Sequence, residues 1–113
     1  QAGILLGSPL YMAPEQARSE ADPRTDIYAF GVVAFQMLTG STPFQGKDSI
    51  DVIAKHLREA PPSLRSLKPD VPPAFASLVH KCLEKNPKDR FQSMDEVLAA
   101  LRAVSTPSGA SSV

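Results

Sequence analysis

Four polar side chains stand out as candidates for chemistry in this sequence: Ser8, Glu15, Asp26 and Arg90. A carboxylate and a guanidinium can form a two-armed ion pair, and a serine hydroxyl can donate and accept hydrogen bonds. Each residue also has a simple structural interpretation. A serine before a proline is common in turns, an acidic residue is favourable where a helix begins, and an arginine can be a solvated loop residue.

Other reactive side chains lack the neighbours that a catalytic or metal site needs. Residues 52–55 read Val-Ile-Ala-Lys, which is superficially like a nucleotide-anchoring lysine motif, yet no Gly-x-Gly-x-x-Gly precedes them. His56 and His80 are far apart and without a ligand cluster, so we expect solvated or helix-face positions for both. Cys82, the single cysteine, fits a buried apolar position and favours a reducing, cytoplasmic setting. We predict no metal site.

Composition limits the class of protein. The 113 residues make at most one domain, and 12 basic and 12 acidic side chains leave no field of one sign to attract nucleic acid or an anionic membrane. No apolar run approaches the roughly 20 residues that span a bilayer. We therefore expect neither nucleic acid nor a membrane segment among the partners.

The elements that must position these residues are helical. Apolar periodicity and capping residues predict helices near residues 14–18, 26–39, 48–58, 73–85 and 94–104. The 26–39 helix has Thr25 as its expected N-cap and Gly40 at its end. Because it is apolar almost all round, we expect it to be buried on every side. Asp48 is the expected cap of the next helix, whose apolar stripe is Ile50, Ile53, Ala54 and Leu57.

The last helix has a capping box, in which Ser93 and Glu96 satisfy each other's backbone donors. We expect five apolar residues to face inward from it: Met94, Val97, Leu98, Leu101 and Val104. No confident strand is predicted, although residues 4–6 are a candidate for extended chain. Residues 105–113 are small and polar and indicate a flexible tail. The predicted fold class is all-α.

Four segments carry a more specific signal, and they occur in a fixed order. They read Gly-Ser-Pro-Leu-Tyr-Met-Ala-Pro-Glu-Gln at 7–16, Asp-Pro-Arg-Thr-Asp-Ile-Tyr-Ala-Phe-Gly-Val-Val at 22–33, Leu-Thr-Gly-Ser-Thr-Pro-Phe at 38–44 and Cys-Leu-Glu-Lys-Asn-Pro-Lys-Asp-Arg-Phe at 82–91. This series resembles the helical C-terminal lobe of a eukaryotic-like, bacterial-type Ser/Thr protein kinase, from the substrate loop and its Ala-Pro-Glu segment to the final helix. The resemblance covers about residues 7–104.

The resemblance implies roles for two acidic residues. Glu15 is expected to pair with Arg90 and so to clamp the substrate loop to the far end of the lobe. Asp26 matches a carboxylate that accepts backbone donors from the catalytic loop and holds that loop rigid. For the 113 residues alone, a simple first-turn acidic residue is the favoured interpretation of Asp26.

The resemblance also implies a peptide-binding loop. Ser8 stands where these kinases usually carry threonine, whose hydroxyl lies against the catalytic aspartate and lysine, so Ser8 is an accessory residue that keeps the hydroxyl and loses a methyl group. Ser8 and the segment 9–12, namely Pro9, Leu10, Tyr11 and Met12, are expected to shape the pocket for the substrate side chain after the phosphoacceptor. Tyr11 could instead be a packed core aromatic.

The activity implied for a complete kinase is transfer of the ATP γ-phosphoryl group to a protein Ser or Thr with magnesium present. The Gly-rich loop, strand lysine, His-Arg-Asp and Asp-Phe-Gly motifs precede Ala-Pro-Glu in that family, and residues 1–6 match only the end of the activation segment. We therefore expect a lobe without the β-rich N-terminal lobe, inactive alone and binding no cofactor, with the rest of the kinase domain and a substrate Ser/Thr segment as partners.

A non-catalytic binding module is the alternative, holding a substrate or kinase partner through residues 7–15 and 48–58. If the 26–39 helix has no cover on one face, we also expect marginal stability and self-association. The serine-rich tail is compatible with a linker to a membrane anchor or sensor.

Overall fold

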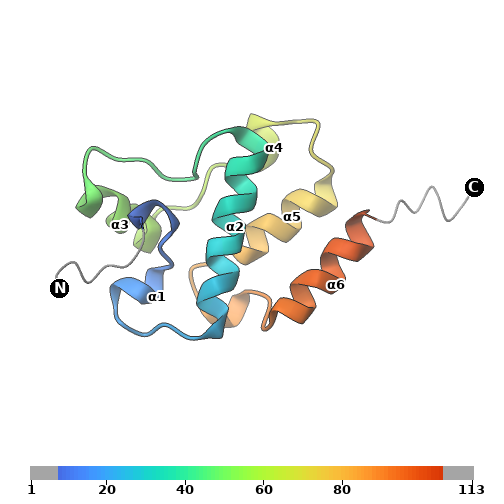
Figure 1. Ribbon diagram of the computed structural model, residues 1–113. Coiled ribbons are helices and arrows are strands. Elements are labelled where there is room, and N and C mark those ends of the chain that lie inside the picture. Colours follow the sequence, from blue (N-terminus) through green and yellow to red (C-terminus); the bar gives the residue numbers. More distant parts are fainter. Residues whose placement is uncertain (1–7, 106–113) are drawn as a thin grey trace, which may run out of the picture.

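The computed structural model describes residues 8–105, and within that range every regular element is a helix (Figure 1). The all-α prediction is confirmed there. Expectations for residues 1–6 as the end of an activation segment, for an extended segment 4–6, for Gly7 and for the tail at 106–113 lie outside the described residues. Helix α2 (Pro23–Thr39) runs through the middle of the molecule (Figure 1). On one side of it lie α1 (Pro14–Ala17) and α3 (Ser49–Arg58), and on the other lie α5 (Pro73–Cys82) and α6 (Met94–Ser105).

Helix α2 (Pro23–Thr39) begins earlier than predicted, and Thr25 is not its N-cap. Asp22 caps it instead, because its Oδ1 accepts a hydrogen bond from Arg24 N at 2.7 Å and Pro23 supplies the fixed φ that suits a first helical position. Thr25 Oγ1 accepts from Asp22 N at 3.0 Å. Gly40 ends the helix with φ 87°, the left-handed conformation that glycine adopts without strain.

The prediction that α2 is buried on every side is wrong. Met37 is 81% exposed and Val33 is 43% exposed. With the half-buried Phe30, Ala34 and Leu38 of α2 and Phe75 of α5 (Pro73–Cys82), they line an apolar groove of about 360 Å³. The other faces of α2 are covered by α5, the short helix α4 (Leu64–Leu67) and the turn η2 (Pro9–Tyr11).

Helix α5 crosses α2 at Gly31, where a Cβ would lie 2.8 Å from the Cβ of Cys82. It ends at Cys82 and not near residue 85, because the chain turns through η3 (Pro87–Asp89), which Asn86 caps with its side chain. Helix α4 was not predicted; Ser63 Oγ caps it by accepting from Ser66 N at 3.3 Å.

Helix α3 (Ser49–Arg58) has the predicted Asp48 cap, with Oδ1 accepting from Asp51 N at 2.8 Å. Its buried face differs from the predicted stripe. Val52 and His56 are buried, whereas Ile50 is 78% exposed. The loop around Leu10 and the side chain of Phe44 cover the face that carries His56, and this tertiary cover selects a different side of the helix.

Helix α6 (Met94–Ser105) packs on α5 through Val97, Leu101 and Val104. Met94 and Leu98 are 47% and 45% exposed, so the prediction that they face inward is wrong: α5 covers only a narrow stripe, and these two residues flank it. The capping box is half formed. Ser93 Oγ accepts from Glu96 N, but Glu96 Oε1 accepts from Gln92 N at 2.7 Å.

Candidate functional site

The segment around η2 is a tight turn held by its own side chains and by α2. Ser8 caps the turn, since its Oγ accepts a hydrogen bond from Leu10 N at 3.2 Å. Tyr11 N donates to Ser8 O at 3.1 Å and Met12 N donates to Pro9 O at 3.2 Å. The Tyr11 hydroxyl donates to Gln36 Oε1 of α2 at 2.6 Å. The turn therefore presents a fixed backbone shape.

Helix α1 (Pro14–Ala17) follows the turn and carries Glu15, which is buried. Glu15 Oε1 and Oε2 accept from Nη2 and Nη1 of Arg90, each at 2.7 Å. Thr25 Oγ1 donates to Glu15 Oε2 at 2.7 Å. The structure thus contains the two-armed Glu15 and Arg90 ion pair and adds a third partner from the first turn of α2.

Arg90 is fully buried, and all five N–H bonds of its guanidinium have acceptors. Besides Glu15, they reach three backbone carbonyl oxygens, those of Glu84 at 2.7 Å, Arg24 at 3.0 Å and Lys85 at 3.2 Å. The guanidinium also lies 5.0 Å from the centre of the Tyr28 ring, a cation–π contact. A lysine could not replace this planar set of donors.

The pKa of the Glu15 carboxyl is set by opposing influences. Burial alone raises it, whereas hydrogen bonds from Arg90 and Thr25 favour the ionised form, and the net pKa lies below its ordinary value. Glu15 is therefore ionised at neutral pH, as a salt bridge with Arg90 requires.

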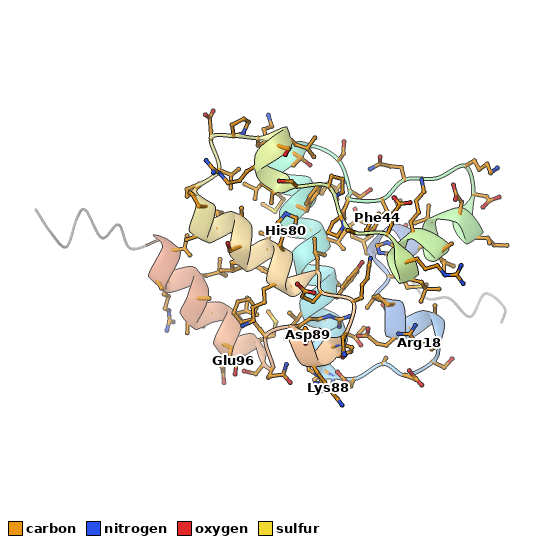
Figure 2. The ribbon with its side chains drawn as sticks, turned by 180° about the vertical axis from the view of Figure 1, so that it is seen from behind. Arg18, Phe44, His80, Lys88, Asp89 and Glu96 are labelled. Atoms are coloured by element: carbon orange, nitrogen blue, oxygen red, sulfur yellow. The ribbon has the colours of Figure 1, made fainter. Side chains whose placement is uncertain are left out.

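His56 is the residue that sequence reasoning missed. It is 1% exposed, not solvated as expected. Its Nε2 lies 3.1 Å from the carbonyl oxygen of Leu10, and its Nδ1 lies 2.6 Å from the hydroxyl of Tyr28. The Phe44 ring meets the imidazole edge to face at 4.9 Å. Figure 2 shows Phe44 on the side of the molecule that carries α3. One sequence signal could have found it: His56 is four positions after Val52 on α3.

A pocket of about 270 Å³ opens between η2 and the start of α2. Its lining includes four of the residues singled out from the sequence, Ser8, Tyr11, Met12 and Asp26, together with Gln16, Thr25 and Ala29. Pro9 and Leu10 are not part of it. Tyr11 also packs against the core, as its alternative interpretation expects. Asp26 is exposed, and within residues 8–105 no hydrogen-bond donor reaches its carboxylate.

The remaining candidates have structural surroundings. His80, labelled in Figure 2, accepts a hydrogen bond from Leu64 N through Nε2 at 3.0 Å, and burial lowers its pKa. Lys55 Nζ donates to Gln45 O at 2.6 Å. Burial raises the pKa of the Cys82 thiol to about 12. Among the described residues, no helix combines the length and apolar character needed to cross a membrane.

Comparison with known proteins gives one family. A family model described as "Protein kinase domain" matches residues 3–101. Curated relatives include "Serine/threonine-protein kinase pkn3" of Myxococcus xanthus, 43% identical over 107 residues, which are 92% of this chain and 20% of that protein. "Serine/threonine-protein kinase PknA" of Mycobacterium tuberculosis is 39% identical over 111 residues, 95% of this chain and 25% of that protein. "Probable serine/threonine-protein kinase PknB" of Lactococcus lactis is 39% identical over 99 residues, 87% and 16% respectively. The chain thus spans between about a sixth and a quarter of the length of these relatives.

Proposed function

Because this chain belongs to the protein kinase domain family, we propose that it is part of a protein Ser/Thr kinase and supplies the platform that holds the substrate peptide. The names of the bacterial relatives support the Ser/Thr class. The observation that carries the proposal is the pocket that Ser8 and Asp26 both line, beside the turn that Ser8 caps.

Each residue of the pocket has a share in this role. The segment from Pro9 to Met12 receives the substrate side chain that follows the phosphoacceptor, with Met12 and Tyr11 lining the pocket. Ser8 directs a hydroxyl to the reacting end. Asp26 anchors the catalytic loop, since its exposed carboxylate can accept backbone N–H groups from another segment. The buried Glu15 and Arg90 pair fixes the loop from behind.

The pocket does not suit a nucleotide. Its lining holds one carboxylate, that of Asp26, and no lysine or arginine, so nothing there neutralises phosphate charge. In a complete kinase domain, magnesium ions neutralise the charge of the γ-phosphoryl group as it passes to a Ser or Thr hydroxyl. We assign ATP and magnesium to residues outside this chain, and phosphoryl transfer to the complete domain. A reducing cytoplasm, which the single cysteine favours, suits this activity.

Radiolabelled ATP tests the proposal. The full-length product of the gene that encodes this chain should phosphorylate Ser or Thr in a peptide library, and the 113 residues alone should not. Asp26→Asn should remove most of the activity, whereas Asp95→Asn, on the exposed first turn of α6, should leave it unchanged.

Two outcomes would count against the proposal. Transfer by the 113 residues alone would show that the chemistry is in this chain. A full-length product that binds the peptides but transfers no phosphate would favour the alternative, a non-catalytic binding module that uses the same loop and helix α3.

A further inference from the structure

We propose that His56 is a positioning residue for peptide recognition: its Nε2–H holds the Leu10 carbonyl and thereby fixes the substrate-binding turn on helix α3. The role in peptide recognition rests on the proposed function, whereas the hydrogen bond between His56 and Leu10 is observed independently of that function. The imidazole is the only side chain within the described residues that bonds a backbone carbonyl of η2.

The tautomer follows from the partners. A carbonyl oxygen can only accept, so the 3.1 Å contact with Leu10 O requires a proton on Nε2. The neutral ring then has a lone pair on Nδ1, which accepts from the Tyr28 hydroxyl at 2.6 Å. Both ring nitrogens are therefore used by the neutral form: the Leu10 carbonyl selects the tautomer, and the Tyr28 hydroxyl, which can donate or accept, donates to the remaining lone pair.

The surroundings favour this neutral state. The imidazole is 1% exposed and is flanked by the rings of Tyr28 and Phe44. The ammonium of Lys85, which lies 4.4 Å from the centre of the Phe44 ring, disfavours a second positive charge on His56. Burial together with Lys85 outweighs the favourable Leu10 bond, and the pKa of His56 falls to about 4.

The bond fixes one whole peptide unit of the turn. His56 holds the carbonyl of Leu10, and the next N–H, that of Tyr11, donates to Ser8 O at 3.1 Å. The 10–11 peptide plane therefore cannot rotate without breaking two hydrogen bonds. Because Tyr11 and Ser8 both line the pocket, the orientation of this plane sets the shape that a substrate meets.

Three substitutions separate the two hydrogen bonds from packing. His56→Gln carries an N–H₂ near the place of Nε2 and keeps a donor for Leu10 O. His56→Asn carries its amide oxygen near the place of Nδ1 and keeps only an acceptor for Tyr28. His56→Phe keeps the ring and loses both bonds. Arg58→Ala, at the exposed end of α3, is the matched control.

Steady-state kinetics of the full-length gene product give the first readout. We expect His56→Asn and His56→Phe to raise the KM for a Ser/Thr peptide about tenfold, the effect of one lost hydrogen bond. The KM for ATP and kcat should stay within about twofold, and His56→Gln should restore the peptide KM. A merely structural role would lower the apparent kcat in proportion to the folded fraction and would leave both KM values unchanged. An unchanged peptide KM in His56→Asn, or equal KM values for Asn and Gln, would overturn the inference.

Nitrogen-15 spectra of the histidine ring give a readout that needs no activity. We expect the Nε2–H tautomer at pH 7, and shifts in the amide signals of residues 10–12 in His56→Asn that His56→Gln does not produce. An Nδ1–H tautomer would overturn the positioning role. If the wild-type product transfers no phosphate while these spectra hold, the proposed kinase function fails and the positioning of the turn stands.

Discussion

Glu15 and Arg90, which are 75 positions apart in the sequence, form two hydrogen bonds of 2.7 Å with each other, and each residue is 2% exposed. The pair joins helix α1, which follows the turn η2, to the segment before the last helix. Because Arg90 also bonds three backbone carbonyls, it is the point at which α1, the start of α2 and the end of α5 meet.

Neutralising Glu15 should be strongly destabilising. Glu15→Gln leaves the guanidinium of Arg90 buried without a counter-charge, and breaking a buried pair typically costs about 3–5 kcal/mol. Urea unfolding followed by circular dichroism measures the change. Glu20→Gln is the control, because its ion pair with Arg18 is largely exposed and should contribute less than about 1 kcal/mol. If both substitutions lower the free energy of unfolding equally, the buried pair contributes no more to stability than an exposed one.

Lowering the pH from 6.5 to 4 should destabilise the fold through His56. The pKa of His56 is about 4 in the folded state and 6.5 ordinarily, so the unfolded state binds more protons as pH falls from 6.5 to 4. Above pH 6.5 the contribution of His56 to the free energy of unfolding is fully present. About 3 kcal/mol of it is lost as the pH falls from 6.5 to 4. Denaturant titrations at pH 7.0 and 4.5 measure the loss.

His56→Gln is the control for this pH effect. The variant should lose much of the pH dependence between 6.5 and 4.5. A residual slope of the same sign is expected from His80, whose pKa is also lowered by burial. A slope that is identical in wild type and variant would mean that His56 becomes protonated as readily in the folded chain as in the unfolded one.

Thr25 should stabilise the site through its hydroxyl and not through its methyl group. Its Oγ1 donates to Glu15 and accepts from Asp22 N. Thr25→Val keeps the shape, removes both hydrogen bonds and should cost about 2–3 kcal/mol, since a hydrogen bond to a charged group contributes more than a neutral one. Thr25→Ser should retain most of the stability. Thermal unfolding of both variants measures the two effects. If Thr25→Ser is as unstable as Thr25→Val, the stabilisation comes from packing and not from the hydroxyl.

The apolar groove between α2 and α5 should make this chain self-associate or bind the dye ANS. Met37, at its rim, is 81% exposed. Met37→Lys should reduce dye fluorescence and the sedimentation coefficient without loss of helix content, because an exposed side chain contributes little to stability. Ile50→Lys changes an equally exposed residue, 78%, outside the groove, and should change neither readout. Wild type that sediments as a monomer and leaves the dye dark would contradict this expectation.

Gly31 should not tolerate a methyl group. A Cβ there would lie 2.8 Å from Cys82 Cβ and 3.1 Å from Leu83 Cδ2, so Gly31→Ala forces α2 and α5 apart at a cost of about 1–3 kcal/mol. Cys82→Ala in the same chain should not relieve the clash, because its Cβ remains, whereas Cys82→Gly should relieve it in part. Urea unfolding of the single and double variants gives the comparison.

Local signals in the sequence predicted which segments are helical better than they predicted which side of each helix is buried. The caps Asp48 and Gly40 act within one turn of their helix, and both are where the sequence places them. The start of α2 differs from the prediction, because Asp22 as cap and Pro23 as first helical residue begin the helix ahead of Thr25. The buried sides of α3 and α6 depend on which elements cover them, and periodicity carries no information about that cover.

The same contrast between local signals and long-range contacts applies to the candidate site. Glu15 and Arg90 are linked by no periodicity, so only the family resemblance could pair them. The sequence did not predict the burial of His56, because a histidine on a helix is ordinarily solvated. The partners of His56, the Leu10 carbonyl and the Tyr28 hydroxyl, lie 46 and 28 positions away. The sequence signal for its burial is the position of His56 on α3, four residues after Val52, which is buried.

The long separation of Glu15 and Arg90 also sets an order of events during protein synthesis. Since domains fold as they leave the ribosome, helix α1 and the first turn of α2 emerge long before the segment that carries Arg90. Until that segment emerges, Glu15 has no guanidinium to neutralise it, and burying it would be costly. Helix α1 and the turn η2 before it can therefore take their final places only after the segment that carries Arg90 has been translated.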